Sequence, residues 1–160
     1  MTPPLVVSST PFAHVGPAAP INASGVVPVA PSRFVFIDNQ NPTELLELTL
    51  NPDGTQREPL KRRQMTGLSG GSLSDPEGLT NIDVNGEVDL IVASSGSVWR
   101  DPSSGQAVVK HGLVRVRYRP EGDLVAEAMP GFRDWVLAQH PTLAHAAELD
   151  PDHGGLNIEG

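Results

Sequence analysis

The stretch Asp75-Pro76-Glu77-Gly78-Leu79-Thr80 opens a run of predicted β-hairpins, and its Glu-Gly core occurs again later in the chain. The second occurrence is Leu156-Asn157-Ile158-Glu159-Gly160, at the last residue of the sequence. A weaker relative, Asn22-Ala23-Ser24-Gly25-Val26-Val27, precedes both. Repetition at this scale indicates a repeat architecture, and we expect the sequence to end on the first strand of a new repeat.

Strand patterns surround this stretch on both sides. Upstream, residues 46–50 alternate leucine with Glu47 and Thr49, which is the period of a half-buried strand. Downstream, Asp83-Val84-Asn85-Gly86 predicts a hairpin turn. Residues 113–119 place Val114, Val116 and Tyr118 on one face and three arginines on the other. These patterns predict antiparallel strands joined by tight turns.

Counted in this way, residues 21 to about 63 hold four strands, and residues 77–129 hold four more. Four antiparallel strands joined by tight turns are the pattern of a β-propeller blade. The sequence therefore predicts an all-β fold of propeller type with blade one at about 21–63, a linker at 64–74, blade two at about 75–129, a short helical insert at 130–149 and the start of blade three at 154–160. A β-sandwich also fits the strand count, but it does not predict the recurring Glu-Gly strand starts.

Composition limits the classes of function. The formal charge of -8 over 160 residues argues against a nucleic-acid partner, because phosphate binding needs a basic face. The chain has no cysteine, which excludes disulfides and thiolate ligands, and no apolar run long enough to span a bilayer. Residues 1–20 carry five prolines and no charged start of a secretory signal, so we expect an extended or poorly ordered lead-in and a cytoplasmic location by default.

Five segments follow one another in an order that resembles a known family. They are Ala23-Ser24-Gly25, Phe36-Ile37-Asp38-Asn39, residues 75–80, Ala93-Ser94-Ser95-Gly96-Ser97, and residues 154–160. The order resembles the N-terminal part of an uncharacterised bacterial propeller-like family, a domain of unknown function related in pattern to the phytase-like esterase propellers. The resemblance covers residues 21–160 and implies a truncated propeller. Relatives often carry histidine in the segment that matches Ser94 to Ser97, where this chain has Gly96, so no role resting on that histidine is expected here.

Glu77 and Glu159 are candidate metal ligands. The first strand of each propeller blade lines the central channel, so carboxylates from successive blades would converge there and could bind calcium. Asp38 and Asn157 stand at neighbouring strand ends and would add oxygen ligands. The alternative is a structural role, in which each glutamate caps backbone amides between blades and recurs because the blade recurs.

The predicted insert and the segment after the second blade's apolar strand supply candidate ligand-binding residues. Trp135 could cap a channel and Arg133 could hold an anion, and Ser95 is a third candidate for contacting a small-molecule or anionic ligand. The structural alternative is that Phe132 and Trp135 pin the insert to the second blade.

Two other motifs match only in letters. Gly67-Leu68-Ser69-Gly70-Gly71 has the spacing of a nucleophile elbow, but no apolar strand precedes it and no helix follows it. The segment Asp150-Pro151-Asp152-His153-Gly154-Gly155 resembles the start of a calcium loop, but Glu159 falls two places too early for the bidentate ligand. We interpret both as turns or linkers.

Three hypotheses of function follow. The first is a binding or scaffold module with no catalysis of its own. The second is a metal-assisted hydrolase of phosphoesters or esters that uses Glu77 and Glu159. The third is a protein-interaction module, and open blade edges would favour self-association.

Overall fold

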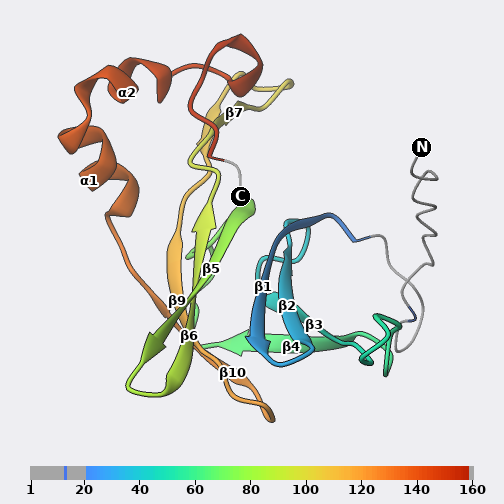
Figure 1. Ribbon diagram of the computed structural model, residues 1–160. Helices are drawn as coiled ribbons and strands as arrows, with labels where there is room; N and C mark the ends of the chain where they lie inside the picture. Colours follow the sequence, from blue (N-terminus) through green and yellow to red (C-terminus); the bar gives the residue numbers. More distant parts are fainter. Residues whose placement is uncertain (1–12, 14–20, 159–160) are drawn as a thin grey trace, which may run out of the picture.

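The computed structural model describes residue 13 and residues 21–158 (Figure 1). The predicted lead-in, apart from Ala13, and the candidate ligand Glu159 lie outside the described residues. The strands are β1 Ala23–Ala30, β2 Arg33–Asp38, β3 Glu44–Thr49, β4 Lys61–Thr66, β5 Pro76–Val84, β6 Glu87–Ser94, β7 Val98–Arg100, β8 Ala107–Val109, β9 Leu113–Arg117 and β10 Leu124–Ala128. Two helices follow, α1 Phe132–Gln139 and α2 Pro141–Ala146, and then a 3-10 turn at Pro151–His153.

The all-β prediction is confirmed, and so is the helical insert after Pro130. Eight strands form one sheet in the order β1-β2-β3-β4-β10-β9-β6-β5. Strands β1 to β4 are an antiparallel meander, and β5, β6, β9 and β10 form a second antiparallel unit. The sequence therefore predicts the two four-stranded units, with strand ends displaced by a few residues.

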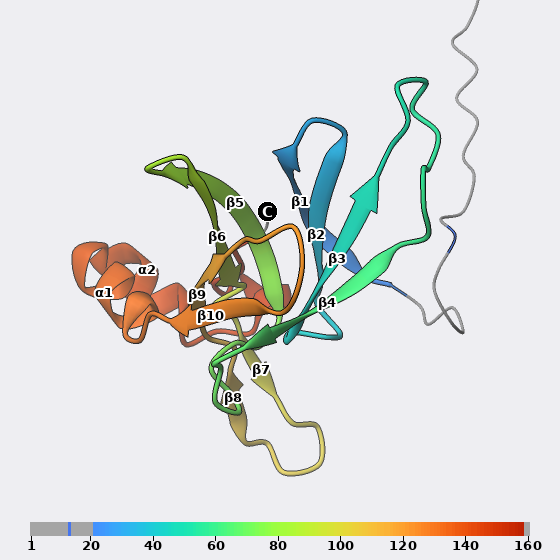
Figure 2. The ribbon, with the colours of Figure 1, turned by 90° about the horizontal axis from the view of Figure 1, so that it is seen from below.

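The two units are joined differently from propeller blades, which are separate sheets. Strand β4 pairs with β10 in parallel through Leu124 opposite Met65 and Val125 opposite Thr66. At the other end of the order, β1 packs against β5, so the sheet is nearly closed into a barrel (Figures 1 and 2).

The seam between β1 and β5 is closed by side chains. A Cβ atom on Gly25 would lie 2.8 Å from the Cβ of Leu79, so only glycine permits this approach of the two strands. The Asn81 side-chain amide donates a hydrogen bond to the Pro28 carbonyl across the seam. Close packing and side-chain hydrogen bonds thus replace a backbone ladder between these two strands.

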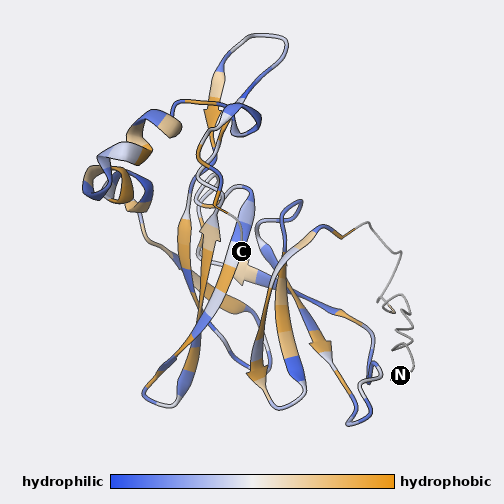
Figure 3. Ribbon diagram, turned by 45° about the horizontal axis from the view of Figure 1, so that its top comes forward, coloured by the Kyte–Doolittle hydropathy of each residue, from blue (hydrophilic) through white to orange (hydrophobic). Residues whose placement is uncertain are grey.

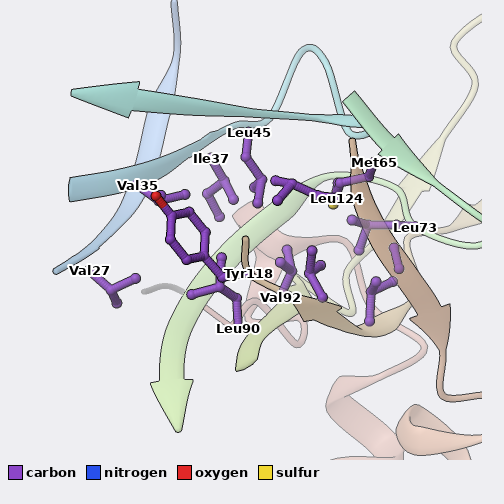
Figure 4. Close-up of a cluster of buried hydrophobic side chains, with 13 residues drawn as sticks. Val27, Val35, Ile37, Leu45, Met65, Leu73, Leu90, Val92, Tyr118 and Leu124 are labelled. Atoms are coloured by element: carbon purple, nitrogen blue, oxygen red, sulfur yellow. The ribbon is translucent and has the colours of Figure 1, made fainter. Parts of the chain in front are cut away.

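The core fills the inside of the barrel, and both units contribute to it (Figure 4). Figure 3 shows hydrophobic stretches along the strands that supply it. Its thirteen buried residues are Val27, Val35, Ile37, Leu45, Met65, Leu73, Leu90, Val92, Val114, Val116, Tyr118, Leu124 and Ala126. The predicted inward face of β9, with Val114, Val116 and Tyr118, is confirmed.

A second, smaller cluster lies on the other face of the meander. Its buried residues are Phe36, Leu46, Leu48 and Leu60. Because Leu46 and Leu48 belong to this cluster, the intervening Glu47 points to the opposite face, where it is 3% exposed. The prediction of a half-buried strand over residues 46–50 is therefore wrong, since both faces of β3 are buried.

One local prediction also differs from the structure. Residues 155–158 form no strand, and Leu156 and Ile158 instead hydrogen-bond through their backbone N–H groups to the carbonyls of Ala146 and Ser95. Between β6 and β9, the region from Gly96 to His111 contains the β7–β8 hairpin, which projects away from the barrel (Figure 1). No helix in the described part of the chain is long and apolar enough to cross a membrane.

Candidate functional site

The predicted metal ligands are dispersed or engaged in structural contacts. Asp38 is 1% exposed, and its Oδ1 accepts hydrogen bonds from the backbone N–H groups of Asn22 at 3.2 Å and Gln40 at 3.1 Å. Its Oδ2 accepts from the Asn41 side-chain amide at 2.7 Å. Asp38 thus stabilises the turn between β2 and β3. Asn157 is exposed near the end of the described chain.

Glu77 connects the two units. Its Oε1 accepts a hydrogen bond from the Asn39 side-chain amide at 3.0 Å, and the Asn39 oxygen accepts one from the Asn22 side chain at 2.9 Å. Among the described residues, no group of three or more His, Cys, Asp or Glu side chains is placed to hold a metal ion. The contact with Asn39 supports a structural role for Glu77, the alternative to metal binding. The donor is a side-chain amide, whereas that alternative predicted backbone amides.

The predicted ligand-binding residues Ser95 and Arg133 are placed next to one another by structural contacts. Ser95 is fully buried, and its hydroxyl donates to Asp75 Oδ2 at 2.6 Å. Arg133 donates from Nε to the Gly96 carbonyl at 3.1 Å and from Nη2 to the Ala147 carbonyl at 2.8 Å. Arg133 therefore ties α1 both to the segment after β6 and to the end of α2.

Trp135 lies on the outside of α1, with 60% of its surface exposed. Its ring stacks on Phe132 at a centroid distance of 6.3 Å. This arrangement leaves most of the indole in solvent and covers no channel.

A different group of residues forms a hollow at one end of the barrel, which we call the barrel mouth. It lies among the β1–β2, β5–β6 and β9–β10 turns, at the end that Figure 2 views from below. The hollow has a volume of about 700 Å³. It is lined by Val29, Ala30, Arg33, Gly86, Glu87, Val88, Arg117, Tyr118, Arg119, Pro120 and Glu121.

A buried polar network is connected to this hollow through Tyr118, which lines it. Glu47 Oε2 accepts hydrogen bonds from Arg63 Nη1 at 2.7 Å and from the Tyr118 hydroxyl at 2.9 Å. Arg63 is itself 9% exposed and donates from Nη2 to the carbonyls of Arg119 at 2.8 Å and Gly122 at 2.7 Å. The β9–β10 turn is thereby held against β3 and β4, and the backbone of the mouth is fixed.

Arginine side chains at the mouth retain unused hydrogen-bond donors. Arg33 Nε lies 3.7 Å from Glu47 Oε1, and the hydrogen bond with Tyr118 raises the pKa of Arg33 above its ordinary value. Arg117 lies 3.8 Å from Glu87 and 4.0 Å from Asp89, distances too long for hydrogen bonds. Arg119 makes no side-chain ion pair with the described residues. Guanidinium groups with free donors are suited to binding carboxylate or phosphate.

The sequence contains a partial signal for this site, the outward face of one predicted strand. The alternation in residues 113–119 identifies the outward arginines, but nothing in the sequence shows that β2 brings Arg33 to the same end. That meeting depends on the pairing of β4 with β10, which closes the sheet.

Burial raises the pKa of the Tyr118 phenol above its ordinary value near 10. In the unfolded chain the phenol ionises at about pH 10, whereas in the folded protein it still holds its proton there. Above about pH 10 the unfolded state therefore binds fewer protons, and we expect the free energy of unfolding to fall as the pH rises.

The chain has one tyrosine, so the ultraviolet absorbance of phenolate reports Tyr118 alone. In a spectrophotometric titration we expect its midpoint in the folded protein to lie above that in denaturant. Equal midpoints would show that the phenol is not buried against Glu47. The Tyr118→Phe variant is the control for stability. Because it lacks the phenol, its free energy of unfolding should fall less steeply above about pH 10 than that of the unaltered protein.

Comparisons with protein-family models, with curated proteins and with solved structures find no match for this chain.

Proposed function

We propose that this protein is a binding module that holds an organic anion at the barrel mouth. The observation that carries the proposal is the meeting of Arg33, Arg117 and Arg119 in one hollow, around the hydroxyl-bearing Tyr118. The volume of about 700 Å³ falls within the range of small-molecule sites. Val29 and Val88 supply apolar wall for the carbon skeleton of such a ligand.

Charge and chemistry of the lining support binding of an anion. Three guanidinium groups stand against the two carboxylates of Glu87 and Glu121, in a chain that is acidic as a whole. The lining includes no Ser, Cys or His that could act as nucleophile or as its base. The features present are those of recognition.

The Arg119→Met variant tests this proposal. Arg119 is exposed and its side chain makes no ion pair with the described residues, so we expect its loss to leave the melting temperature unchanged. Binding of citrate, measured by titration calorimetry, should weaken at least about tenfold, since a hydrogen bond to a charged group contributes about 1.5–3 kcal/mol. The affinity of the unaltered protein should also fall with added salt.

Arg100→Met is the matched control, because it removes one positive charge from the exposed β7–β8 hairpin, away from the mouth. Equal weakening by the two substitutions would mean that only net charge matters. No measurable binding of citrate, inorganic phosphate or other small anions to the unaltered protein would overturn the proposal.

A protein-interaction role is a second candidate, and the β7–β8 hairpin favours it. Trp99 and Val108 stand opposite one another in the register and are 44% and 40% exposed. Apolar side chains at this exposure on a projecting hairpin are typical of a contact surface.

A further inference from the structure

A row of arginines lies on the outward face of β9 and just beyond its end, and it continues from the barrel mouth. Arg115, Arg117 and Arg119 alternate with the inward side chains of Val116 and Tyr118. On a β-strand, alternate residues are about 6.6–6.8 Å apart, which is the spacing of Arg115 and Arg117. We call these three residues the arginine row.

A buried carboxylate holds part of the arginine row in place. Asp89 is 1% exposed, and its Oδ2 accepts hydrogen bonds from both Nε and Nη2 of Arg115, the first at 2.7 Å. Its Oδ1 has no hydrogen-bond partner among the described residues and lies 4.0 Å from Arg117 Nε. This carboxylate thus orients the Arg115 guanidinium, which lowers the entropy lost when that group binds a ligand.

The row borders a hollow of its own and exposed apolar side chains. The hollow is about 220 Å³ and is lined by Arg115, Arg117, Arg119, Val125 and Glu127. Val125 stands opposite Arg117 on β10 and is 60% exposed. On the far side of β6, Ile82 stands opposite Asp89 and is 44% exposed. Apolar positions therefore flank the charged ones on both sides of this face.

We propose that the arginine row binds an acidic peptide in extended conformation, with alternate carboxylates paired to Arg115, Arg117 and Arg119. This inference rests on the proposed function and names its ligand class, because Arg117 and Arg119 belong to both hollows. An extended peptide has the same two-residue repeat as β9, so successive Asp or Glu side chains meet successive arginines.

A peptide fits this face better than single-stranded nucleic acid, the other linear polyanion of similar repeat. Binding of single strands relies on aromatic side chains on which bases stack. The large hydrophobic side chains exposed beside the row are Val125 and Ile82, whereas Trp99 and Trp135 lie on the hairpin and on α1. Aliphatic contacts suit the intervening residues of a peptide.

The experiment compares two capped peptides of equal composition by fluorescence anisotropy on the full chain. One alternates three glutamates with threonines, and the other groups its three glutamates at one end, so that only two of them lie on the same face of an extended chain. We expect the alternating peptide to bind at least about tenfold more tightly, because only it can pair with three arginines at once. Equal affinities, or tighter binding of a single-stranded oligonucleotide, would overturn the inference.

The Glu127→Gln variant separates this inference from the proposed function. Glu127 lines the hollow of the arginine row and is absent from the mouth, so its neutralisation should strengthen binding of the alternating peptide severalfold and leave citrate binding unchanged. Glu148→Gln is the matched control, with the same charge change at an exposed position after α2. Citrate binding without preference for the alternating peptide refutes the inference alone, whereas failure of both ligands refutes the proposed function as well.

Discussion

Replacing Arg63 with methionine is expected to lower the free energy of unfolding by about 3–5 kcal/mol, the usual cost of leaving a buried charge without its partner. The variant removes the guanidinium that pairs with Glu47 Oε2 and leaves the carbonyls of Arg119 and Gly122 without their donor. Glu47 would keep the Tyr118 hydroxyl as a donor and Arg33 at 3.7 Å, but it would remain a buried carboxylate without its hydrogen-bonded cation. Chemical denaturation monitored by circular dichroism measures the loss.

The double variant Arg63→Met with Glu47→Gln is the informative control. The amide of glutamine retains an oxygen for the Tyr118 hydroxyl and removes the unpaired charge, so we expect the double variant to be more stable than Arg63→Met alone. The matched control is Arg62→Met, at the neighbouring position, where the arginine pairs with Glu44 at the surface. It should lower the free energy of unfolding by less than about 1 kcal/mol. A loss below about 1 kcal/mol for Arg63→Met would show that the network is not buried.

Replacing Leu90 with alanine is expected to cost about 2–5 kcal/mol of unfolding free energy. Leu90 is fully buried on β6 in the thirteen-residue core, which also contains Leu45 from the meander. Truncation removes apolar contacts and opens a cavity between the two units. Since both units share this core, thermal unfolding should remain a single transition at a lower temperature.

Val125→Ala is the matched control on the same sheet. Val125 is 60% exposed on the outer face of β10, and its truncation should change stability by less than about 0.5 kcal/mol. Two separate transitions in the Leu90→Ala variant would mean that the units unfold independently, against the single core described above.

The strands could be predicted from the sequence because hydrophobic periodicity and turn residues are local signals. Asn85 and Gly86, both at positive φ, form the turn that the sequence predicts between β5 and β6. The way the units join could not be predicted, since the β4–β10 pair spans only two residues of each strand and carries no distinctive pattern. The burial of Glu47 could not be predicted for a related reason. The register of β3 with β4 places Arg63 opposite Leu45, and the long side chain of Arg63 reaches Glu47 from there.

The candidate site was harder to predict than the fold. The arginines of β9 were recognised as one face of a strand, but their significance depends on Arg33 and Asp89, which come from β2 and β6. The recurring Glu-Gly phrase drew the functional interpretation to Glu77 instead. In the structure Glu77 accepts a hydrogen bond from the Asn39 side-chain amide and so connects the two units, which is a structural role.

The parallel pair of β4 and β10 has a consequence for the order in which the protein folds. The meander β1 to β4 needs only contacts between neighbouring strands, whereas the Thr66 hydroxyl meets the Leu124 carbonyl across 58 positions of the chain. Local pairings form quickly and distant ones slowly, so the meander is expected to assemble first and ring closure to limit the rate. On a ribosome, the edge of β4 would stay open until β10 emerges, and the exposed charges of Lys61 and Arg62 on that strand would protect it from pairing with other chains meanwhile.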